Sequence, residues 1–228
     1  MNFQRARTEG QKAIRVNQIV DITVELYNEM PYDAITLTKI ASKLDFTRAN
    51  LYKYFSTKEE IFLVIIERDI KTWADDICGT LERHGSINIQ AFSEIWASTL
   101  FDHARLIQLL PILNTVIEKN VSVEALTVLK KSMFESFSRI SDKITEIIPH
   151  MTAELSFLFF NFQMYYAMGL YPATVPNEIQ EKAMKLSGMP YKAETFVPAF
   201  SKFIVTVLQG LIYQNTNVRH NASPDGIF

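Results

Sequence analysis

Residues 36–62 read TLTKIASKLDFTRANLYKYFSTKEEIF, and their pattern predicts two short helices joined by a tight turn. Thr36 and Thr47 are each followed by apolar residues at helical spacing, and threonine is favoured at the position just before a helix. Asp45 and Phe46 separate the two helices, and aspartate tolerates the backbone of a turn. Each helix is expected to span about seven to nine residues, which is the build of a helix-turn-helix motif.

The second of these helices carries an unusually polar and aromatic outer face. In a helix-turn-helix, the second helix enters the major groove of DNA and presents its first side chains to base edges. Arg48 suits guanine, Asn50 suits adenine, and Ala49 is small enough to approach a thymine methyl group. Four longer side chains have the reach for phosphates: Tyr52, Lys53, Tyr54 and Lys58. The alternative for Arg48 and Asn50 is that they are ordinary surface residues in contact with water. The alternative for Tyr54 is that it covers the core of the small domain.

The rest of the chain is predicted to be helical as well. It has 228 residues, 48% of them apolar, with few glycines and prolines, so an all-α fold is expected. Apolar residues at three- and four-residue steps predict helices over 12–29, 57–83, 88–104, 122–148, 152–170 and 196–212. The expected helix caps are Ser86, Ser122, Thr152 and a capping box at 57–60. Four prolines are expected to break or separate helices: Pro111, Pro172, Pro176 and Pro190.

Charge is unevenly distributed along the chain. The net charge is −2, yet residues 1–58 contain nine Lys and Arg against six Asp and Glu. The first 58 residues are therefore basic and the remainder is acidic. A basic module attached to an acidic body is the distribution expected of a domain that binds nucleic acid.

Several other classes of protein are disfavoured. The single cysteine, Cys78, excludes an internal disulfide, and residues 1–10 lack the apolar core of a signal peptide, so a cytoplasmic location is expected. The apolar stretch 155–170 is interrupted by Asn161 and Gln163 and is shorter than a membrane span, so no membrane is expected as a partner. The four histidines lie far apart, and no phosphate loop or nucleophile elbow is present, so no metal, cofactor or enzyme activity is expected.

Residues 12–70 resemble the TetR family of bacterial regulators. The resemblance rests on one set of positions: Ala41, Leu44, Leu51, Tyr52, Tyr54, Phe55, Lys58, Glu59, Glu60 and Phe62. Family members usually carry glycine where this chain has Asp45. The resemblance implies an all-helical homodimer, in which a three-helix DNA-binding domain is followed by a larger domain that holds a small ligand and the dimer contacts. We therefore expect a DNA-binding domain at 10–56, a connecting helix at 57–84, a ligand and dimer domain at 85–214 and a frayed tail at 215–228.

The same resemblance implies site residues. Those facing bases or nearby phosphates would be Thr47, Arg48, Ala49, Asn50 and Tyr52, and those at the DNA backbone would be Thr36, Thr38, Lys53, Tyr54 and Lys58. The last two long helices would form the dimer interface, with Phe157, Phe200, Phe203, Ile204, Val207, Leu208 and Leu211 as contacts and Gly210 allowing close approach. Candidate pocket residues are Trp96, Phe101, Phe134, Phe137, Phe160 and Tyr165, although packing in the core is the alternative for each.

These expectations combine into one functional hypothesis. The chain is predicted to be a homodimeric repressor that binds double-stranded DNA at a palindromic operator and is released by a small, largely apolar effector. One alternative is a regulator of the same fold that is controlled by a protein partner. Another is a helical ligand-binding protein or enzyme whose helix-turn-helix is vestigial.

Overall fold

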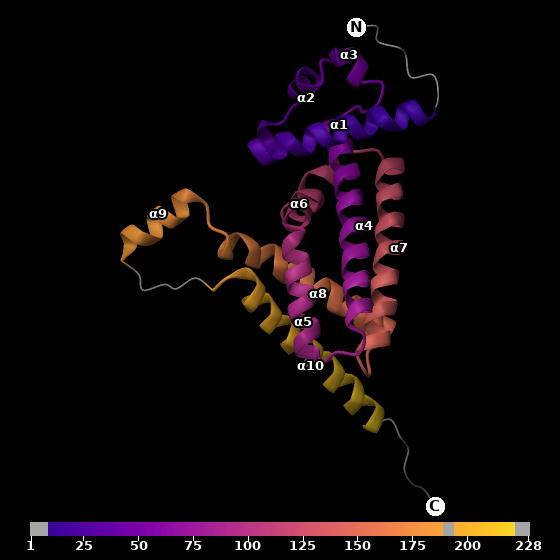
Figure 1. Cartoon of the computed structure of the whole chain (residues 1–228), viewed down its shortest axis with the longest axis vertical. Helices are drawn as coiled ribbons and strands as arrows, with labels where there is room; N and C mark the ends of the chain where they lie inside the picture. Colours follow the sequence, from indigo (N-terminus) through magenta and orange to yellow (C-terminus); the bar gives the residue numbers. More distant parts are fainter. Residues whose placement is uncertain (1–8, 189–193, 222–228) are drawn as a thin grey trace, which may run out of the picture. The chain divides into compact units, whose positions relative to one another are not determined.

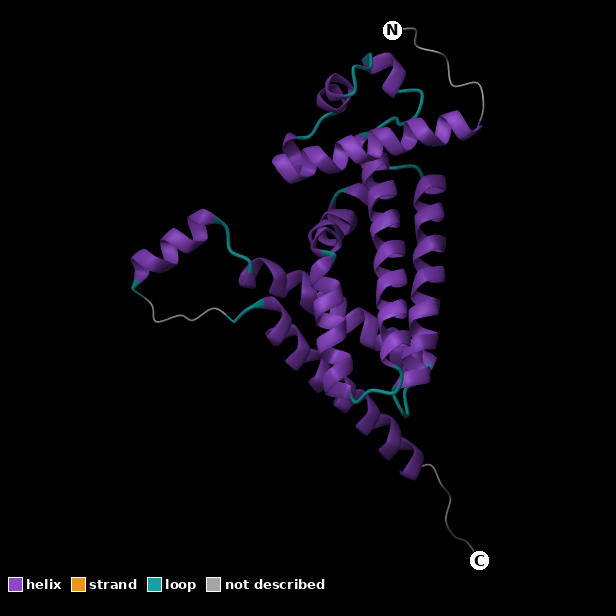
Figure 2. Ribbon diagram, viewed as in Figure 1, coloured by secondary structure: helices purple, strands orange, loops and turns teal. Residues whose placement is uncertain are grey.

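The computed structural model describes residues 9–188 and 194–221, and within these ranges it contains helices and no strands (Figures 1 and 2). The elements are α1 Glu9–Glu29, η1 Tyr32–Ala34, α2 Leu37–Lys43, α3 Arg48–Leu51, α4 Lys58–His84, α5 Ile89–Asp102, α6 Ala104–Thr115, η2 Ile117–Lys119, α7 Val123–Ile147, α8 Ala153–Thr174, α9 Glu178–Ser187 and α10 Phe196–Asn221. The all-α prediction is therefore confirmed for the described chain.

The helices form two compact units. The first contains residues 1–68 and 112–132, and the second contains residues 69–111 and 133–228. The helix α4 therefore contributes its first turns to one unit and the remainder to the other. The predicted domain limits, at 56/57 and 84/85, cut the chain into consecutive segments. In the structure, residues 112–132 instead belong to the same unit as the N-terminal helices.

The first unit is built around a small apolar core. Helix α1 packs on α2, and α2 packs on α3. Their fully buried side chains include Ile19, Ile40 and Leu51, and Phe62 of α4 joins them. Buried residues on each short helix fix which of its faces turns outward. Consequently, the outer face of α3 is left to the polar residues that follow Thr47.

Side-chain caps begin the short helices at the predicted positions. The Thr36 hydroxyl accepts a hydrogen bond from the Lys39 amide, and the Thr47 hydroxyl accepts one from the Asn50 amide. Helix α3 is shorter than predicted, because it ends at Leu51 and continues as a turn. Asp45 has a φ of 54°, the left-handed conformation that glycine adopts without strain, which accounts for the usual glycine there.

Of the four other predicted caps, two differ from expectation and two are confirmed. At 57–60 the Glu60 amide donates to the Thr57 hydroxyl as predicted, but the Glu60 carboxylate accepts from the Ser56 amide instead of completing the box. Asn88, not Ser86, caps α5, because its carbonyl oxygen lies 2.9 Å from the Ala91 amide nitrogen. The predicted caps at Ser122 and Thr152 are confirmed by their hydrogen bonds to the third residue beyond.

The predicted breaks at two prolines are wrong. Helix α6 continues through Pro111 to Thr115, and α8 continues through Pro172 to Thr174. Packing on other helices offsets the one hydrogen bond that each proline removes. Helix α9 was not predicted, and α10 extends to Asn221, beyond the expected start of the tail at 215. Pro190 and residues 222–228 of the predicted tail lie outside the described residues.

The second unit has an aromatic core. Helix α10 packs against α5 and α8, and Trp73 of α4, Trp96 of α5 and Phe160 of α8 are buried with their ring centroids 5.5–5.8 Å apart. Residues 196–216 of α10 are long and apolar enough to cross a membrane, but a third of that window is buried within the protein. A core helix of a globular domain passes the same test of length and composition, so this stretch is weak evidence for a membrane span.

Candidate nucleic-acid interface

Arg48 and Tyr52 form an ordered pair on the outer face of α3. The Arg48 guanidinium donates to the Tyr52 hydroxyl at 3.0 Å, and its central carbon lies 5.5 Å from the centre of the tyrosine ring. Both side chains are exposed. Stacking on a ring limits the rotamers of the long arginine side chain, so less conformational entropy is lost when it binds. The two side chains are therefore preorganised, and they are accessible to a ligand that binds from solvent.

The neighbouring polar residues lie on the same helix and the turn that follows it. The Lys53 ammonium donates to the Asn50 carbonyl oxygen at 2.7 Å, which leaves the Asn50 amide NH2 outside this bond. Ala49 and Lys53 are exposed, and Asn50 is half-buried. Arginine, asparagine, lysine and alanine side chains are thereby brought together on one short segment. Their chemistry covers base edges, methyl groups and phosphates.

Three predicted DNA contacts are threonines: Thr36 and Thr38 at the backbone, and Thr47 near bases or phosphates. Thr36, Thr38 and Thr47 are all exposed. Thr36 and Thr47 each use the hydroxyl oxygen to accept a hydrogen bond from a helix amide, so the hydroxyl hydrogen still has a donor function. Tyr54 is half-buried, which agrees with the alternative that it partly covers the small core.

Lys58 has a different setting from the one predicted. Its ammonium donates to the carbonyl oxygens of Tyr32 and Ile35, at 2.9 and 3.1 Å, and lies 4.0 Å from the centre of the Tyr32 ring. The charge is thus already bound by the segment between α1 and α2, so we withdraw Lys58 from the phosphate-contacting set. It holds the start of α4 to the residues that precede the helix-turn-helix.

Tyr32 extends this network and was missed by the sequence reasoning. Its hydroxyl donates to the Glu59 carboxylate at 2.9 Å, and its ring packs edge-on against Phe62. Burial, followed by the hydrogen bond to Glu59, raises the pKa of Tyr32 above its ordinary value. The residues are 26 or 27 positions apart in the chain, so no local pattern indicated the contact.

The six predicted pocket residues have three different settings in the part of the chain that the structure describes. Phe137 and Phe160 lie 4.5 Å apart by ring centroids and join Trp96 in the aromatic core. Phe101 instead stacks on Phe196, with 5.4 Å between ring centroids. The remaining two are on the surface, with Phe134 of α7 73% exposed and Tyr165 of α8 64% exposed.

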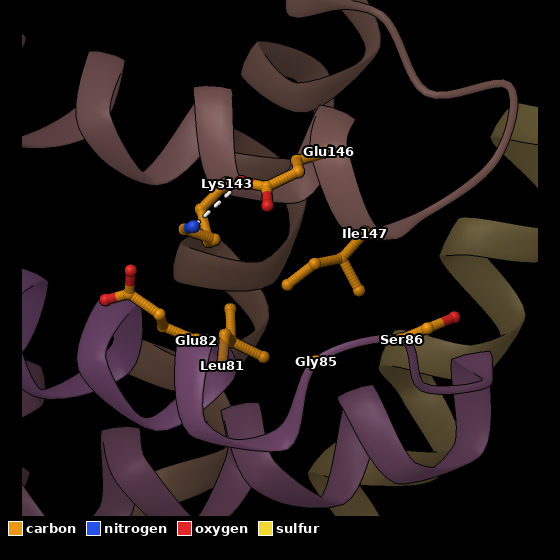
Figure 3. Close-up of a pocket in the computed structure, with 7 residues that line it drawn as sticks. All are labelled: Leu81, Glu82, Gly85, Ser86, Lys143, Glu146 and Ile147. Atoms are coloured by element: carbon orange, nitrogen blue, oxygen red, sulfur yellow. Dashed lines mark hydrogen bonds and ion pairs between the residues drawn. The ribbon is translucent and has the colours of Figure 1, made fainter.

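A separate small pocket lies where α4 and α7 end, and its lining is shown in Figure 3. It encloses about 260 Å³ beside Leu81, Gly85 and Ile147. Lys143 on its rim pairs with Glu146 at 2.7 Å, and this hydrogen bond raises the pKa of the lysine ammonium. The predicted aromatic residues are not among those lining this pocket.

The predicted dimer residues divide into two groups. Phe157 is exposed, and Phe203 and Val207 are half-buried. In contrast, four are buried inside the second unit, where α10 packs on α5 and α8: Phe200, Ile204, Leu208 and Leu211. The prediction is wrong for these four, because a side chain enclosed by its own protomer has no surface left for a partner.

The apolar surface of α8 and α10 contains residues that the prediction omitted. Phe162 and Tyr213 are 45% and 69% exposed, and Tyr166 stacks on Phe203 with 3.8 Å between ring centroids. Tyr165, assigned above to the pocket, belongs to this surface. Gly210 has open space where a side chain would stand, as a close approach by another helix requires. We call this set, Phe157, Phe162, Tyr165, Tyr166, Phe203, Val207 and Tyr213, the outer α8/α10 face.

Comparisons with known proteins agree with this architecture. Residues 19–65 match the family model described as bacterial regulatory proteins of the tetR family, and residues 67–215 match the tetracyclin repressor-like C-terminal domain. The solved structure of the fatty acid degradation regulator FadR from Bacillus halodurans is similar, with a TM-score of 0.52 and 14% identity over 90% of this chain and 97% of that one. At this identity the likeness shows the fold alone. No match was found among curated proteins.

The two family models together cover the helix-turn-helix and the helical unit that follows it. The first match contains the whole of α2 and α3, including the exposed Arg48 and Tyr52 pair. The second match contains most of α4 and all of α5 to α8. The chain therefore belongs to the TetR family and is a DNA-binding transcriptional regulator.

Proposed function

We propose that the chain is a cytoplasmic, homodimeric repressor that binds a palindromic operator and leaves it when a small, largely apolar effector binds. The observation that carries the DNA-binding part is the preorganised, exposed Arg48 and Tyr52 pair on α3. In a protomer bound to DNA, Arg48 reads a guanine through a two-pronged hydrogen bond while it stays stacked on Tyr52, and the Tyr52 hydroxyl donates its hydrogen to a phosphate. Asn50 releases Lys53 and pairs with an adenine, while Lys53 turns to the backbone.

The remaining predicted contacts position α3 in the groove. Thr36, Thr38 and Thr47 lie on the surface of the same unit and donate their hydroxyl hydrogens to phosphates. Ala49 packs against a thymine methyl group. Tyr54 contributes a partly exposed hydroxyl, whereas Lys58 acts through Tyr32 and Ile35 and not through DNA.

Dimerisation is proposed through the outer α8/α10 face. Seven aromatic or aliphatic residues that are exposed or half-buried on two packed helices would be an unusual surface for a monomer in water. A second copy packing on this face through a twofold axis buries it on both protomers. Gly210 then allows the helices to approach closely. The family's pairing of its last two long helices supports this choice of partner.

The effector is proposed to act through α4. This helix spans 27 residues, or about 40 Å, and is continuous from residues of the first unit to residues of the second. Two recognition helices must lie about 34–36 Å apart to enter successive major grooves, so a shift of a few ångströms removes one of them from its groove. A coupling free energy of about 1–3 kcal/mol changes operator affinity about five- to 150-fold.

Operator binding is tested by selecting tight-binding duplexes from a random pool and measuring their affinity by fluorescence anisotropy across a salt series. We expect a near-palindromic site, and we expect Arg48→Ala to lose about 1–3 kcal/mol at one base position. Arg83→Ala is the matched control, since Arg83 is an exposed cation distant in sequence from α3. Failure to enrich any sequence, with Arg48→Ala binding as well as wild type, would contradict the proposed readout.

The dimer is tested by light scattering with Phe162→Glu and Tyr165→Glu. A charge on the outer α8/α10 face should convert the dimer to a monomer, because an unpaired buried carboxylate is strongly unfavourable. Phe134→Glu is the control, because Phe134 is an exposed aromatic on α7, outside this face. A dimer that survives both substitutions on the face would place the interface elsewhere.

A further inference from the structure

Two prolines inside helices lie at one cavity of the second unit. Pro111 is inside α6 and Pro172 is inside α8. A proline has no N–H, so the carbonyl four residues earlier loses the donor it would have in a regular helix. Those carbonyls belong to Ile107 and Met168, and both residues line the same cavity as the two prolines. Two residues whose carbonyls lack their usual helical donor therefore lie at one cavity.

The polar side chains around this cavity add donors. The Gln108 amide nitrogen donates to the Tyr171 hydroxyl at 2.9 Å, so this pair links α6 to α8. Asn177 and Gln180 form the capping box of α9, and both use their carbonyl oxygens for it. The box leaves their NH2 groups to other acceptors. The cavity thus combines backbone acceptors on two helices with amide and phenol donors.

The lining is otherwise apolar and carries no formal charge. Ile107, Pro111, Met168, Pro172 and Val175 supply aliphatic surface, and the lining residues include no Asp, Glu, Lys, Arg or His. The volume of about 340 Å³ is at the lower end of the range of small-molecule sites. A charged ligand would meet no opposite charge among these lining residues. An uncharged molecule with a short apolar chain and one polar end matches these features.

We propose that this cavity, which we call the proline groove, binds a small uncharged amphipathic molecule that has both an N–H or O–H donor and an acceptor. Its donor bonds to the carbonyl of Ile107 or Met168, its acceptor takes a hydrogen bond from Tyr171, Asn177 or Gln180, and its chain lies against the two prolines. The groove differs from the six aromatic positions predicted for a pocket, and nothing in the sequence pattern indicated it.

The site itself does not depend on the repressor proposal, but its regulatory consequence does. Pro111 is the last residue of α6 assigned to the second unit, and the helix continues at Ile112 in the first. A ligand that bonds to the Ile107 carbonyl acts on the turn of α6 that immediately precedes this point. Given the proposed repressor function, binding in the proline groove lowers operator affinity through α6.

The test uses octanamide as the probe and the ¹³C-labelled methyl group of Met168 as the NMR reporter in the full chain. Octan-2-one keeps the acceptor but has no N–H, and octanoate carries a charge. We expect a saturable shift of the Met168 signal with octanamide, about five-fold weaker binding of octan-2-one and still weaker binding of octanoate. Val175→Trp should fill the groove and weaken octanamide at least ten-fold, whereas Leu186→Ala, a change at an exposed position of α9 outside the lining, should not alter it.

Three results would overturn the site: no saturable Met168 shift with octanamide, equal affinities for octanamide and octan-2-one, or unchanged affinity in Val175→Trp. Operator affinity is measured separately by anisotropy. Octanamide that binds in the groove without altering operator affinity would support the site and refute its regulatory role. Operator binding that is itself absent would refute the proposed function while the NMR titration still decides the site.

Discussion

Replacing Lys58 tests whether this residue stabilises the DNA-binding unit or binds DNA. In Lys58→Met the carbonyls of Tyr32 and Ile35 lose a charged donor, and the Tyr32 ring loses a cation at 4.0 Å. Hydrogen bonds from charged donors contribute about 1.5–3 kcal/mol each and the cation–π contact about 0.5–1 kcal/mol. Because the ammonium is only partly buried and must be desolvated, we expect a net loss of about 2–3 kcal/mol.

Hydrogen exchange measures this loss where it occurs. Both tryptophans belong to the second unit, so their fluorescence does not report on the first. Amides around residues 32–36 should exchange about 30- to 150-fold faster in Lys58→Met if local opening governs their exchange. Lys53→Met is the control, because Lys53 is exposed and its ammonium bonds to the side chain of the neighbouring Asn50.

The salt dependence of operator binding separates the two roles. Each lost phosphate contact lowers the slope of log affinity against log salt by about 0.9. Lys53→Met should lower the slope, whereas Lys58→Met should leave it unchanged while destabilising the unit. A Lys58→Met protein with wild-type exchange and a reduced salt slope would refute our reading and restore Lys58 to the phosphate contacts.

Three other changes have defined outcomes. Because the pKa of Tyr32 is raised in the folded state, its contribution to stability is present below its ordinary pKa of about 10 and declines above it. Tyr32→Phe should therefore flatten the loss of melting temperature above about pH 10. Asp69 is buried and accepts two hydrogen bonds from Arg105, at 2.6 and 2.8 Å, which Asp69→Asn disrupts. This substitution should destabilise the second unit by about 2–3 kcal/mol, measured by urea unfolding followed by tryptophan fluorescence. The control Asp76→Asn should have little effect, because Asp76 is exposed. Asp45→Gly should stabilise the first unit by about 0.5–1 kcal/mol, seen as slower exchange in α2, because it relieves a φ of 54°.

Local features of the helix-turn-helix were predictable because their causes are local. Thr36 and Thr47 bond to amides three residues ahead, so residue type and spacing suffice to predict the caps. The apolar residues of α2 recur at helical spacing, which predicts the inward face. The exposed Arg48 and Tyr52 are then the residues left over on the outer side. An unexpected result within this region is the short α3, since a turn replaces its last residues.

What the sequence by itself determined about this chain is its helices, the outer face of α3 and its family, because these follow from short-range spacing. The tertiary structure decided the role of Lys58 and the orientation of α10. Lys58 is a cation that any local pattern would assign to solvent or phosphate, and only the folding of a segment 23–26 residues away supplies its carbonyls. Helix α10 is apolar on several sides, so its periodicity does not reveal which side α5 and α8 cover, and Phe200 and Ile204 turned inward while Tyr213 remained exposed. The proline groove arises for the same reason, since two prolines far apart in the chain come to line one cavity only through the tertiary structure.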